Sequence, residues 1–389
     1  MFNPAISQLT APPVAIVQNW IDAYDGTHGP LIDLSQAVPG YPPHPDLVTA
    51  LASAAANAAS LSYGDIEGEA ELRQAYAEEM MRIYGHDVAM DHVLITSGCN
   101  QAFIISALSV AGAGDTVLMT EPGYFNHDST LAMLGIKTAS VPVLAEDGFI
   151  PSLDAIEKAI TSSTKASQIK ALALVSPNNP TGAIYPPEHL SNILTLCHDR
   201  GVWLILDETY RDFIAADQPR HQLLAHHGRD RLILLYSFSK AYCIPGHRLG
   251  AVCTSPEAIK EMAKIMDNIQ ICAPRVGQQA IAPMIKSLLA WRQDNNEKMA
   301  ARADAFRHAF DQIDGFEIAA MGAYFGYIRH PYQDTSLSVA EDMAKRVGVL
   351  TIPGDFFGKG QEQYLRFAFA NAEIDAIKQL PTRLSALKI

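Results

Sequence analysis

The stretch SFSKAYCIPGHRLG, residues 237–250, decides how the rest of the chain is interpreted. It follows an apolar run, residues 232–236, that is typical of a buried strand. Beyond the predicted strand come Ser237, Lys240, a Pro-Gly turn and Arg248. A lysine just past the end of a core strand lies where open α/β sheets bind ligands. A surface loop that happens to carry one lysine and one arginine has the same composition, so this stretch alone leaves both interpretations open.

Further apolar runs on both sides of this stretch predict the other strands of the same sheet. Helical patterns lie between most of the runs, and continuous apolar runs are typical of parallel strands buried on both faces. The sequence therefore predicts an α/β fold whose large domain has a mostly parallel, seven-stranded, doubly wound sheet. The predicted strands are residues 92–96, 116–120, 137–141, 171–176, 202–207, 232–236 and 251–254.

Two of the predicted strand ends carry groups that bind anions. After the first strand comes TSGCNQ, residues 96–101, which opens a largely apolar helix. A buried helix that starts at a glycine presents free backbone N–H groups and the positive end of its dipole. Ser237 and Arg248 would add a hydroxyl and a positive charge. An ordinary N-cap at Ser97 would be built in the same way, so both interpretations stay open.

Three other strand ends carry groups that a flat, phosphorylated ring would need. Tyr124 can stack on a ring, and Asn179 projects stiffly because a proline follows it. Asp207 ends an apolar strand, where burying a carboxylate costs free energy unless a positive group such as a protonated ring nitrogen lies beside it. Tyr210, three residues later, can donate a hydrogen bond to a phenolate oxygen. Loop packing, a plain turn and a helix cap are the respective alternatives. Together the strand ends indicate that Lys240 holds a phosphorylated aldehyde cofactor as a Schiff base.

The composition of the chain argues against several classes of protein. The formal net charge of −13 over 389 residues disfavours nucleic acid as a partner. No apolar run approaches the ~18 residues of a membrane helix, and the N-terminus has no signal-peptide pattern, so we expect no membrane partner and a cytoplasmic location. The five cysteines are widely spaced, which predicts reduced thiols. The histidines show no ligand spacing, so no metal site is predicted.

Changes in composition and in the pattern of strands and helices along the chain predict three structural segments. Residues 1–45 are rich in proline and are expected to form an N-terminal arm that drapes over another lobe or subunit and contributes to a small domain. Residues 46–285 are expected to form the large cofactor-binding domain, and residues 286–389 the C-terminal small α+β domain. The predicted helices are residues 45–60, a helix after the acidic turn at 67–71, and a long helix within 280–310. The predicted strands of the small domain are residues 316–320, 324–329 and 364–370.

The motifs TSGCNQA, EPGY, SPNNPTG, DETY and SFSKAYCIPGHRLG, in this order, resemble those of the class I/II aminotransferases. These are pyridoxal-phosphate enzymes of fold type I, similar to aspartate aminotransferase, and the similarity extends from Val38 to Arg366. The resemblance implies an enzyme that transfers an amino group from an L-amino acid to a 2-oxo acid by a ping-pong mechanism with pyridoxal 5′-phosphate. It also implies a homodimer with shared active sites.

The resemblance implies a role for each residue of these motifs. Lys240 would be the Schiff-base lysine and would also carry the proton between the substrate Cα and C4′ of the cofactor. Asp207 would pair with the ring nitrogen, Asn179 and Tyr210 would hydrogen-bond the phenolic oxygen, and Tyr124 would stack on the ring. The implied phosphate-binding residues are Ser237, Arg248, the backbone of Gly98, Cys99 and Asn100, and Tyr63 from the neighbouring subunit. The implied substrate-binding residues are Arg366, which would grip the α-carboxylate, Asn179 and Val38.

Two departures from the family pattern affect substrate contacts. The N-terminal loop of the family often contains Gly-x-Pro before an acidic residue, whereas residues 37–41 here are AVPGY. Asn100 stands where some relatives with dicarboxylate activity carry a lysine, which weakens an interpretation as an aspartate-specific enzyme. Arg275, in CAPRVGQQ, is a candidate for a second substrate carboxylate or for a structural salt bridge.

Two other functions are compatible with the same motifs. Lyases and synthases that act at the β- or γ-carbon use the same lysine and ring. A non-catalytic, aminotransferase-like effector-binding module of a transcription regulator is the third possibility, but such modules follow a basic DNA-binding domain, and only about 45 irregular, non-basic residues precede the fold here.

Overall fold

A computed structural model describes residues 2–162 and 168–387 of the chain. The larger of its sheets has seven strands in the order β2-β8-β7-β6-β5-β3-β4. All neighbours are parallel except β8, which is antiparallel to both β2 and β7. The mostly parallel seven-stranded sheet is thus confirmed. The strands are β2 Val93–Thr96, β3 Thr116–Glu121, β4 Lys137–Pro142, β5 Ile169–Val175, β6 Trp203–Asp207, β7 Leu232–Ser237 and β8 Gly250–Cys253.

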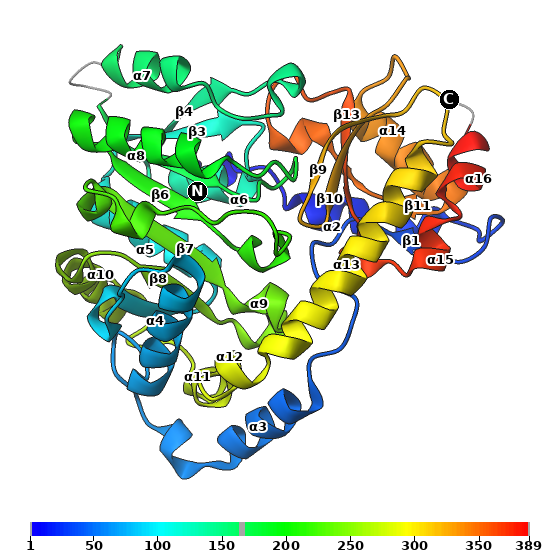
Figure 1. Ribbon diagram of the computed structural model, residues 1–389. Helices are drawn as coiled ribbons and strands as arrows, with labels where there is room; N and C mark the ends of the chain where they lie inside the picture. The colour runs from blue at the N-terminus through cyan, green and yellow to red at the C-terminus, as the bar shows by residue number, and fades with distance from the viewer. Residues whose placement is uncertain (1, 163–167, 388–389) are drawn as a thin grey trace.

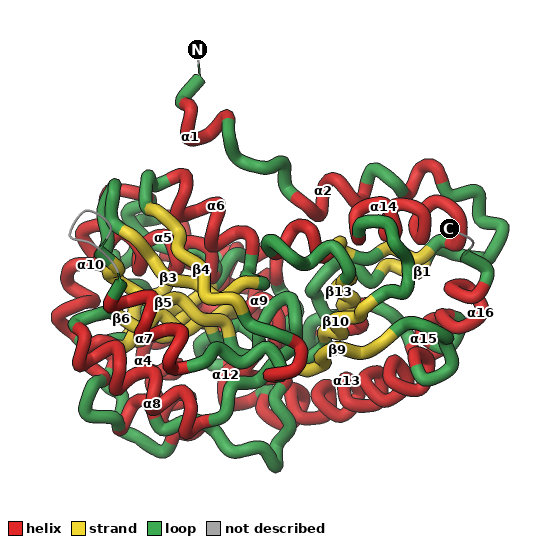
Figure 2. Tube along the Cα trace, turned by 90° about the horizontal axis from the view of Figure 1, so that it is seen from above, coloured by secondary structure: helices red, strands yellow, loops and turns green. Residues whose placement is uncertain are grey.

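The central strands form because their side chains are apolar on both faces. All residues of β7 are buried, as are those of β6 after its first residue, and helices cover both faces of the sheet. The helices α5 and α6 lie on one face, and α7 and α8 on the other (Figures 1 and 2). The helices of this region are α3 Pro45–Ala56, α4 Ala70–Tyr84, α5 Cys99–Val110, α6 Phe125–Met133, α7 Leu153–Thr161, α8 Pro187–Arg200, α9 Phe238–Ala241 and α10 Pro256–Ile269.

A second, smaller sheet confirms the predicted α+β domain. It is antiparallel, with the order β12-β13-β10-β9. Its strands are β9 Glu317–Gly322, β10 Phe325–Arg329, β12 Ile352–Pro353 and β13 Tyr364–Ala368, and the neighbouring helices are α14 Ser336–Asp342, α15 Ile374–Ile377 and α16 Leu380–Ser385. The division at residues 45 and 285 stays a prediction.

The N-terminal segment has more regular structure than its prolines indicated. It contains α1 Pro4–Ser7, α2 Pro13–Gln18 and β1 Ile32–Asp33, which pairs in parallel with β11 Val349–Leu350. These elements are too short to produce a periodic pattern, which is why the sequence did not predict them. The part of the segment before α2 runs along the margin of the molecule, where α1 lies near α6 (Figure 2).

The long helix predicted within residues 280–310 begins later than expected. The chain forms α11 Arg275–Ile281 and α12 Met284–Ser287 before α13 Leu289–Phe310. Pro283 lies between the first two and lacks the N–H that a continuous helix would need. The helix α13 then runs from the large-sheet region to the small sheet (Figure 1).

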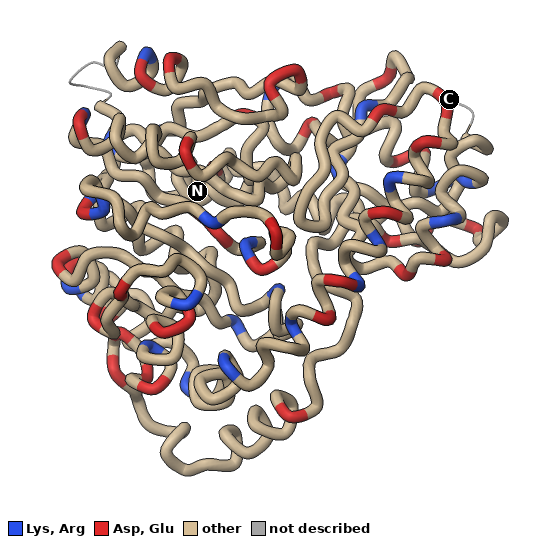
Figure 3. The backbone as a smooth tube through the Cα atoms, viewed as in Figure 1, with Lys and Arg blue, Asp and Glu red and all other residues tan. Residues whose placement is uncertain are grey.

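Acidic positions are spread along the chain and outnumber the basic ones, 42 Asp and Glu against 29 Lys and Arg (Figure 3). Within residues 2–162 and 168–387, no helix combines the length and apolar character needed to cross a membrane. The same residues contain no group of three or more His, Cys, Asp or Glu side chains arranged to hold a metal ion.

Candidate active site at the carboxyl edge of the large sheet

The ends of five strands meet at one edge of the large sheet and enclose a cavity of about 180 Å³. Of the residues singled out from the sequence, nine line it: Cys99, Asn100, Tyr124, Asn179, Asp207, Tyr210, Ser237, Lys240 and Arg248. Gly98 adjoins the cavity through Cys99. Arg366, Val38 and Tyr63 do not line it.

Lys240 is placed by a single turn of helix at the end of β7. This turn, α9, is capped by Ser237, whose hydroxyl accepts a hydrogen bond from the N–H of Ser239 at 3.3 Å. Burial lowers the pKa of Lys240 to about 8, and the positive charges of Arg248 and Arg366 act in the same direction. About a tenth of this amine is therefore neutral at pH 7, far more than for a lysine of ordinary pKa, and the neutral form is the one that acts as a nucleophile or a general base.

Asp207 is a buried carboxylate that the fold keeps ionised. Its burial favours the neutral acid, but hydrogen bonds and charge from His127, followed by hydrogen bonds from Thr209, lower its pKa below the usual value. The Nε2 atom of His127 lies 3.3 Å from Oδ2 of Asp207, and the backbone N–H of Thr209 donates to Oδ1 at 2.9 Å. A negative charge is thus available at the cavity wall.

His127 was missed in the sequence. It lies in the first turn of α6, stacked on Phe103 with 3.8 Å between ring centroids. The available signal was its position three residues after Tyr124, on a helix that starts at the same sheet edge. That position fits a core histidine equally well, so only the contact with Asp207 identifies its role.

Asn179 and Tyr210 form a hydrogen-bonded pair on the cavity wall. The side-chain amide of Asn179 donates to Oη of Tyr210 at 3.4 Å. Burial raises the pKa of Tyr210 well above its ordinary value, so its hydroxyl stays protonated. The ring of Tyr210 packs edge-on against Phe325 of the small sheet, 4.9 Å between centroids, which fixes its direction.

Tyr124 forms another wall of the cavity. Its ring packs edge-on against His127, with 5.2 Å between centroids, and its hydroxyl accepts a hydrogen bond from Asn126 at 2.8 Å. The side chain is therefore held from two directions.

The opposite end of the cavity is built to receive an anion. Gly98 precedes α5 with φ of 84°, and a Cβ atom there would collide with the guanidinium of Arg248. The first N–H groups of α5 point out of the helix at this end. The buried hydroxyl of Ser239 has no hydrogen-bond partner among the described residues. Cationic, N–H and hydroxyl donors thus converge where Ser237 and Arg248 were predicted to bind phosphate.

Arg366 lies behind this cavity on β13 and is fully buried. It donates to Oδ1 of Asn179 at 3.2 Å and to the carbonyl oxygen of Ser35, a partner that the sequence did not indicate. Its Nε atom has no hydrogen-bond partner within the described part of the chain. Burial lowers the pKa of Arg366 to about 10, which still leaves it charged at neutral pH.

Val38 and Tyr63 lie outside the cavity. Val38 is half-buried in the loop after β1, where its N–H donates to the carbonyl oxygen of Gln36 at 3.0 Å. The side chain of Tyr63 is 77% exposed, in the loop before α4. The described chain therefore does not bring Tyr63 to its own cavity.

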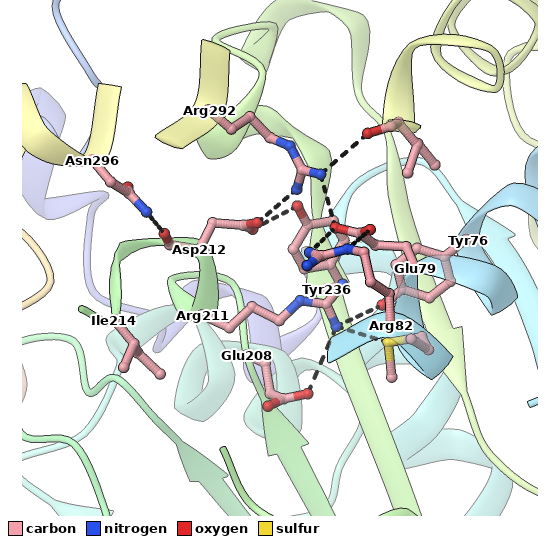
Figure 4. Close-up of polar contacts among 12 residues, drawn as sticks. Tyr76, Glu79, Arg82, Glu208, Arg211, Asp212, Ile214, Tyr236, Arg292 and Asn296 are labelled. Atoms are coloured by element: carbon pink, nitrogen blue, oxygen red, sulfur yellow. Dashed lines mark hydrogen bonds and ion pairs between the residues drawn. The ribbon is translucent and has the colours of Figure 1, made fainter. Parts of the chain in front are cut away.

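A buried ion network supports the segment that follows β6. Arg292 of α13 donates to Asp212 at 2.9 Å and to Glu79 of α4 at 2.8 Å (Figure 4). The neighbouring Arg211 lies over the ring of Tyr236, 4.0 Å from its centroid. The network joins three elements distant in sequence, and it holds the chain just beyond Tyr210.

Comparisons with known proteins bear on the family and the fold of the chain. The family model for aminotransferase class I and II matches residues 29–384. The chain is 30% identical over 329 residues to an aromatic aminotransferase of Arabidopsis thaliana, covering 83% of this chain and 81% of that protein. It is 28% identical over 370 residues to valine–pyruvate aminotransferase of Mycobacterium tuberculosis, covering 94% and 93%. Its fold matches that of Thermus thermophilus aspartate aminotransferase with maleate, with a TM-score of 0.89 at 22% identity over 100% of both chains.

Proposed function

Because the chain belongs to the class I and II aminotransferases, we propose that the cavity beside Lys240 binds pyridoxal 5′-phosphate and serves transamination between an L-amino acid and a 2-oxo acid. The observation that carries the proposal is the lysine itself. Lys240 has a depressed pKa of about 8 and shares its cavity with a buried carboxylate and a group of anion-binding donors.

The donors around the cavity fit this cofactor. The start of α5, Ser237, Ser239 and Arg248 would hold the phosphate, and the unpartnered hydroxyl of Ser239 gives that end an unused donor. At the other end, Asp207 would pair with the ring nitrogen, and Asn179 and Tyr210 would hydrogen-bond the phenolic oxygen. Tyr124 would cover one face of the ring.

Bound pyridoxal phosphate would supply an aldehyde that condenses with amines and a ring that accepts the electron pair released at the substrate Cα. The neutral amine of Lys240 would anchor the aldehyde, and after its release it would take the proton from the substrate Cα and deliver it to C4′ of the cofactor. Burial and the neighbouring guanidinium groups lower the pKa of Lys240, which raises the neutral fraction of the amine for both tasks.

Asp207 would hold the ring nitrogen protonated, since it remains a carboxylate in a buried site. His127 would act through Asp207, because its Nε2 atom fixes one carboxylate oxygen and leaves the group facing the cavity. Arg366 would bind the substrate α-carboxylate with its two outer nitrogens, oriented by Asn179 and by the carbonyl oxygen of Ser35.

We further propose a homodimer in which Tyr63 reaches the phosphate of the neighbouring subunit. Tyr63 and the nearby Leu61 are 77% and 83% exposed, a degree of exposure that favours coverage by a second copy. A cytoplasmic location is part of the same proposal, because all five cysteines are free thiols.

For the amino donor, we propose a neutral side chain rather than a second carboxylate. Arg275, the candidate cation from the sequence, is bound by Glu69 and by the loop around Ser62. The basic residues that line the cavity of the described chain are Lys240 and Arg248, and both have other tasks. Relatives named for aromatic amino acids and for valine are consistent with a neutral donor, whereas others are named for aspartate.

The experiment is a half-reaction panel on the cofactor-loaded protein. Each amino acid is added without an oxo acid, and conversion of bound cofactor to its amine form is followed by absorbance. We expect conversion with neutral amino acids and at least about tenfold slower conversion with aspartate. Lys240→Ala should slow the reaction by about 10³-fold or more, in the range of positioned proton transfer.

The exposed lysine Lys260 of α10 provides the matched control, and Lys260→Ala should react as the parent protein does. Unchanged rates in Lys240→Ala would refute the proposed role. Product formation from an amino acid with repeated turnover and no 2-oxo acid would identify a lyase instead of an aminotransferase.

A further inference from the structure

The loop that carries Tyr63 leaves the aromatic side chain of this residue exposed to solvent. It follows the short helix η2 Ala58–Leu61 and consists mostly of small residues, ending at Gly64. Leu61 and Tyr63 both project into solvent. A loop of this composition would sample many conformations if its backbone were not tied down.

A single arginine joins this loop to the start of α4. Arg275, the first residue of α11, donates through Nη1 to the carbonyl oxygen of Ala59, to the carbonyl oxygen of Ser62 at 3.2 Å and to the Ser62 hydroxyl at 3.0 Å. Its Nε and Nη2 atoms bind the two carboxylate oxygens of Glu69, just before α4. The five donors of a guanidinium are suited to such a bridge, whereas the ammonium of a lysine is not.

Neighbours of Arg275 complete the attachment. Ser60 donates to Gln279 at 2.7 Å, and the N–H of Gly64 donates to the sulfur of Cys272 at 3.4 Å. A Cβ atom at Gly64 would lie 2.9 Å from Nε of Arg275, so the backbone there packs directly on the guanidinium. Residues 272–279 thus hold the loop along its length.

From these contacts we propose that Arg275 is a positioning residue that fixes the Tyr63 loop for its contact with the phosphate in the neighbouring subunit. The inference rests on the proposed role of Tyr63. A loop fixed in advance pays less conformational entropy when the phosphate binds, so the same tyrosine contact contributes more affinity. The arginine is thereby assigned to cofactor retention and not to recognition of a substrate carboxylate.

The test is a double-mutant cycle on cofactor affinity. Cofactor-free protein is titrated with pyridoxal phosphate, and the dissociation constant is measured by fluorescence quenching for Tyr63→Phe, Arg275→Ala and the double variant. We expect Tyr63→Phe to weaken binding by roughly tenfold or more, as for the loss of a hydrogen bond to a charged group. Arg275→Ala should weaken it several-fold, and the double variant should be no weaker than Tyr63→Phe alone.

Arg73 provides a matched control for a purely structural arginine. It is half-buried on α4 and donates to the carbonyl oxygens of Val93 at 2.9 Å and Met90 at 3.1 Å, away from the Tyr63 loop. Arg73→Ala should lower stability, but any effect on cofactor affinity should multiply with that of Tyr63→Phe. Arg275→Lys and Glu69→Gln, which preserve more of the packing, should give intermediate losses and keep the test valid if Arg275→Ala folds poorly.

The outcomes separate the inference from the function on which it rests. An unchanged affinity in Tyr63→Phe would refute the proposed contact of Tyr63 with phosphate. A weakened Tyr63→Phe together with an unaffected Arg275 series would overturn the inference alone. Effects of Arg275→Ala and Tyr63→Phe that multiply would also overturn it, because independent residues do not share one contact.

Discussion

Lys240 illustrates how one residue acquires its chemistry from its surroundings. Its identity and its place after a strand follow from the sequence, but a lysine in water has a pKa of about 10.4 and is almost fully charged at neutral pH. Burial and the two nearby guanidinium groups of Arg248 and Arg366 lower the value to about 8. Arg366 is 126 residues away along the chain, so its share of this effect arises only when the small sheet packs on the large one.

The lowered pKa of Lys240 has a measurable pH dependence. Only the neutral amine condenses with an aldehyde, so we expect the rate of pyridoxal phosphate uptake by cofactor-free protein to rise about tenfold per pH unit below about 8 and to level off above it. Arg366→Gln removes a positive neighbour, so it should raise the pKa and move the plateau to higher pH. Stopped-flow absorbance measures both profiles. A rate that continues to rise to about pH 10 in the parent protein would contradict the lowered pKa.

At the scale of single residues, the sequence motifs predicted the cavity wall well. Nine of the residues singled out line the same cavity, because they follow strands whose ends must meet at one edge of a parallel sheet. His127 and Ser35 were not predicted. Their roles depend on which side chain approaches Asp207 and Arg366 in space, and no local pattern encodes that approach.

At the scale of elements, α13 joins the segment after β6 to the small sheet. Near its start, Arg292 is buried between Asp212 and Glu79, whereas Arg307 at its end forms an exposed pair with Asp304. The two arginines lie on the same helix and have similar partners, but their surroundings differ. Their contributions to stability should differ accordingly.

We expect Arg292→Ala to lower the free energy of unfolding by about 3–5 kcal/mol, because it removes the ion-pair partner of the largely buried Asp212 and one of the two arginines that bind the buried Glu79, which keeps Arg82. Arg307→Ala removes a solvent-exposed ion pair and should cost less than about 1 kcal/mol. Urea unfolding followed by circular dichroism measures both variants. Equal losses in the two would show that the buried network does not support α13.

At the scale of the whole molecule, the proposed dimer completes a site that one protomer leaves without Tyr63. The resemblance of the sequence already implied that Tyr63 reaches the phosphate of the neighbouring subunit, which would explain why Tyr63 does not line the cavity of its own chain. Its 77% exposure in one protomer fits a contribution to a second copy. A site built from residues of two subunits can be tested by mixing two variants, each of which lacks a different residue of the site.

In a hybrid of Lys240→Ala and Tyr63→Ala subunits, one site combines both defects and the other has neither. We therefore expect mixing and refolding the two variants to restore activity well above either variant alone, up to about half the parent activity per hybrid. Sedimentation should show a particle of twice the 42.2 kDa chain mass. If Tyr63 acted within its own chain, every site of the hybrid would keep one defect and no activity would return.

The sequence by itself determined the α/β fold, the large sheet and the order of the site residues along it. Those features depend on local patterns: apolar runs, glycine turns and polar residues that directly follow strands. It did not determine where α13 begins, because the helical pattern continues through Leu288, where the chain passes from α12 to α13, nor whether Arg275 meets a substrate or a salt bridge. Tertiary structure decided the latter by placing Glu69 against Arg275, 206 residues away in the chain. It likewise placed His127 at Asp207 and Arg366 at Asn179, because charge pairing, burial and the resulting pKa values depend on distances in space that sequence separation does not specify.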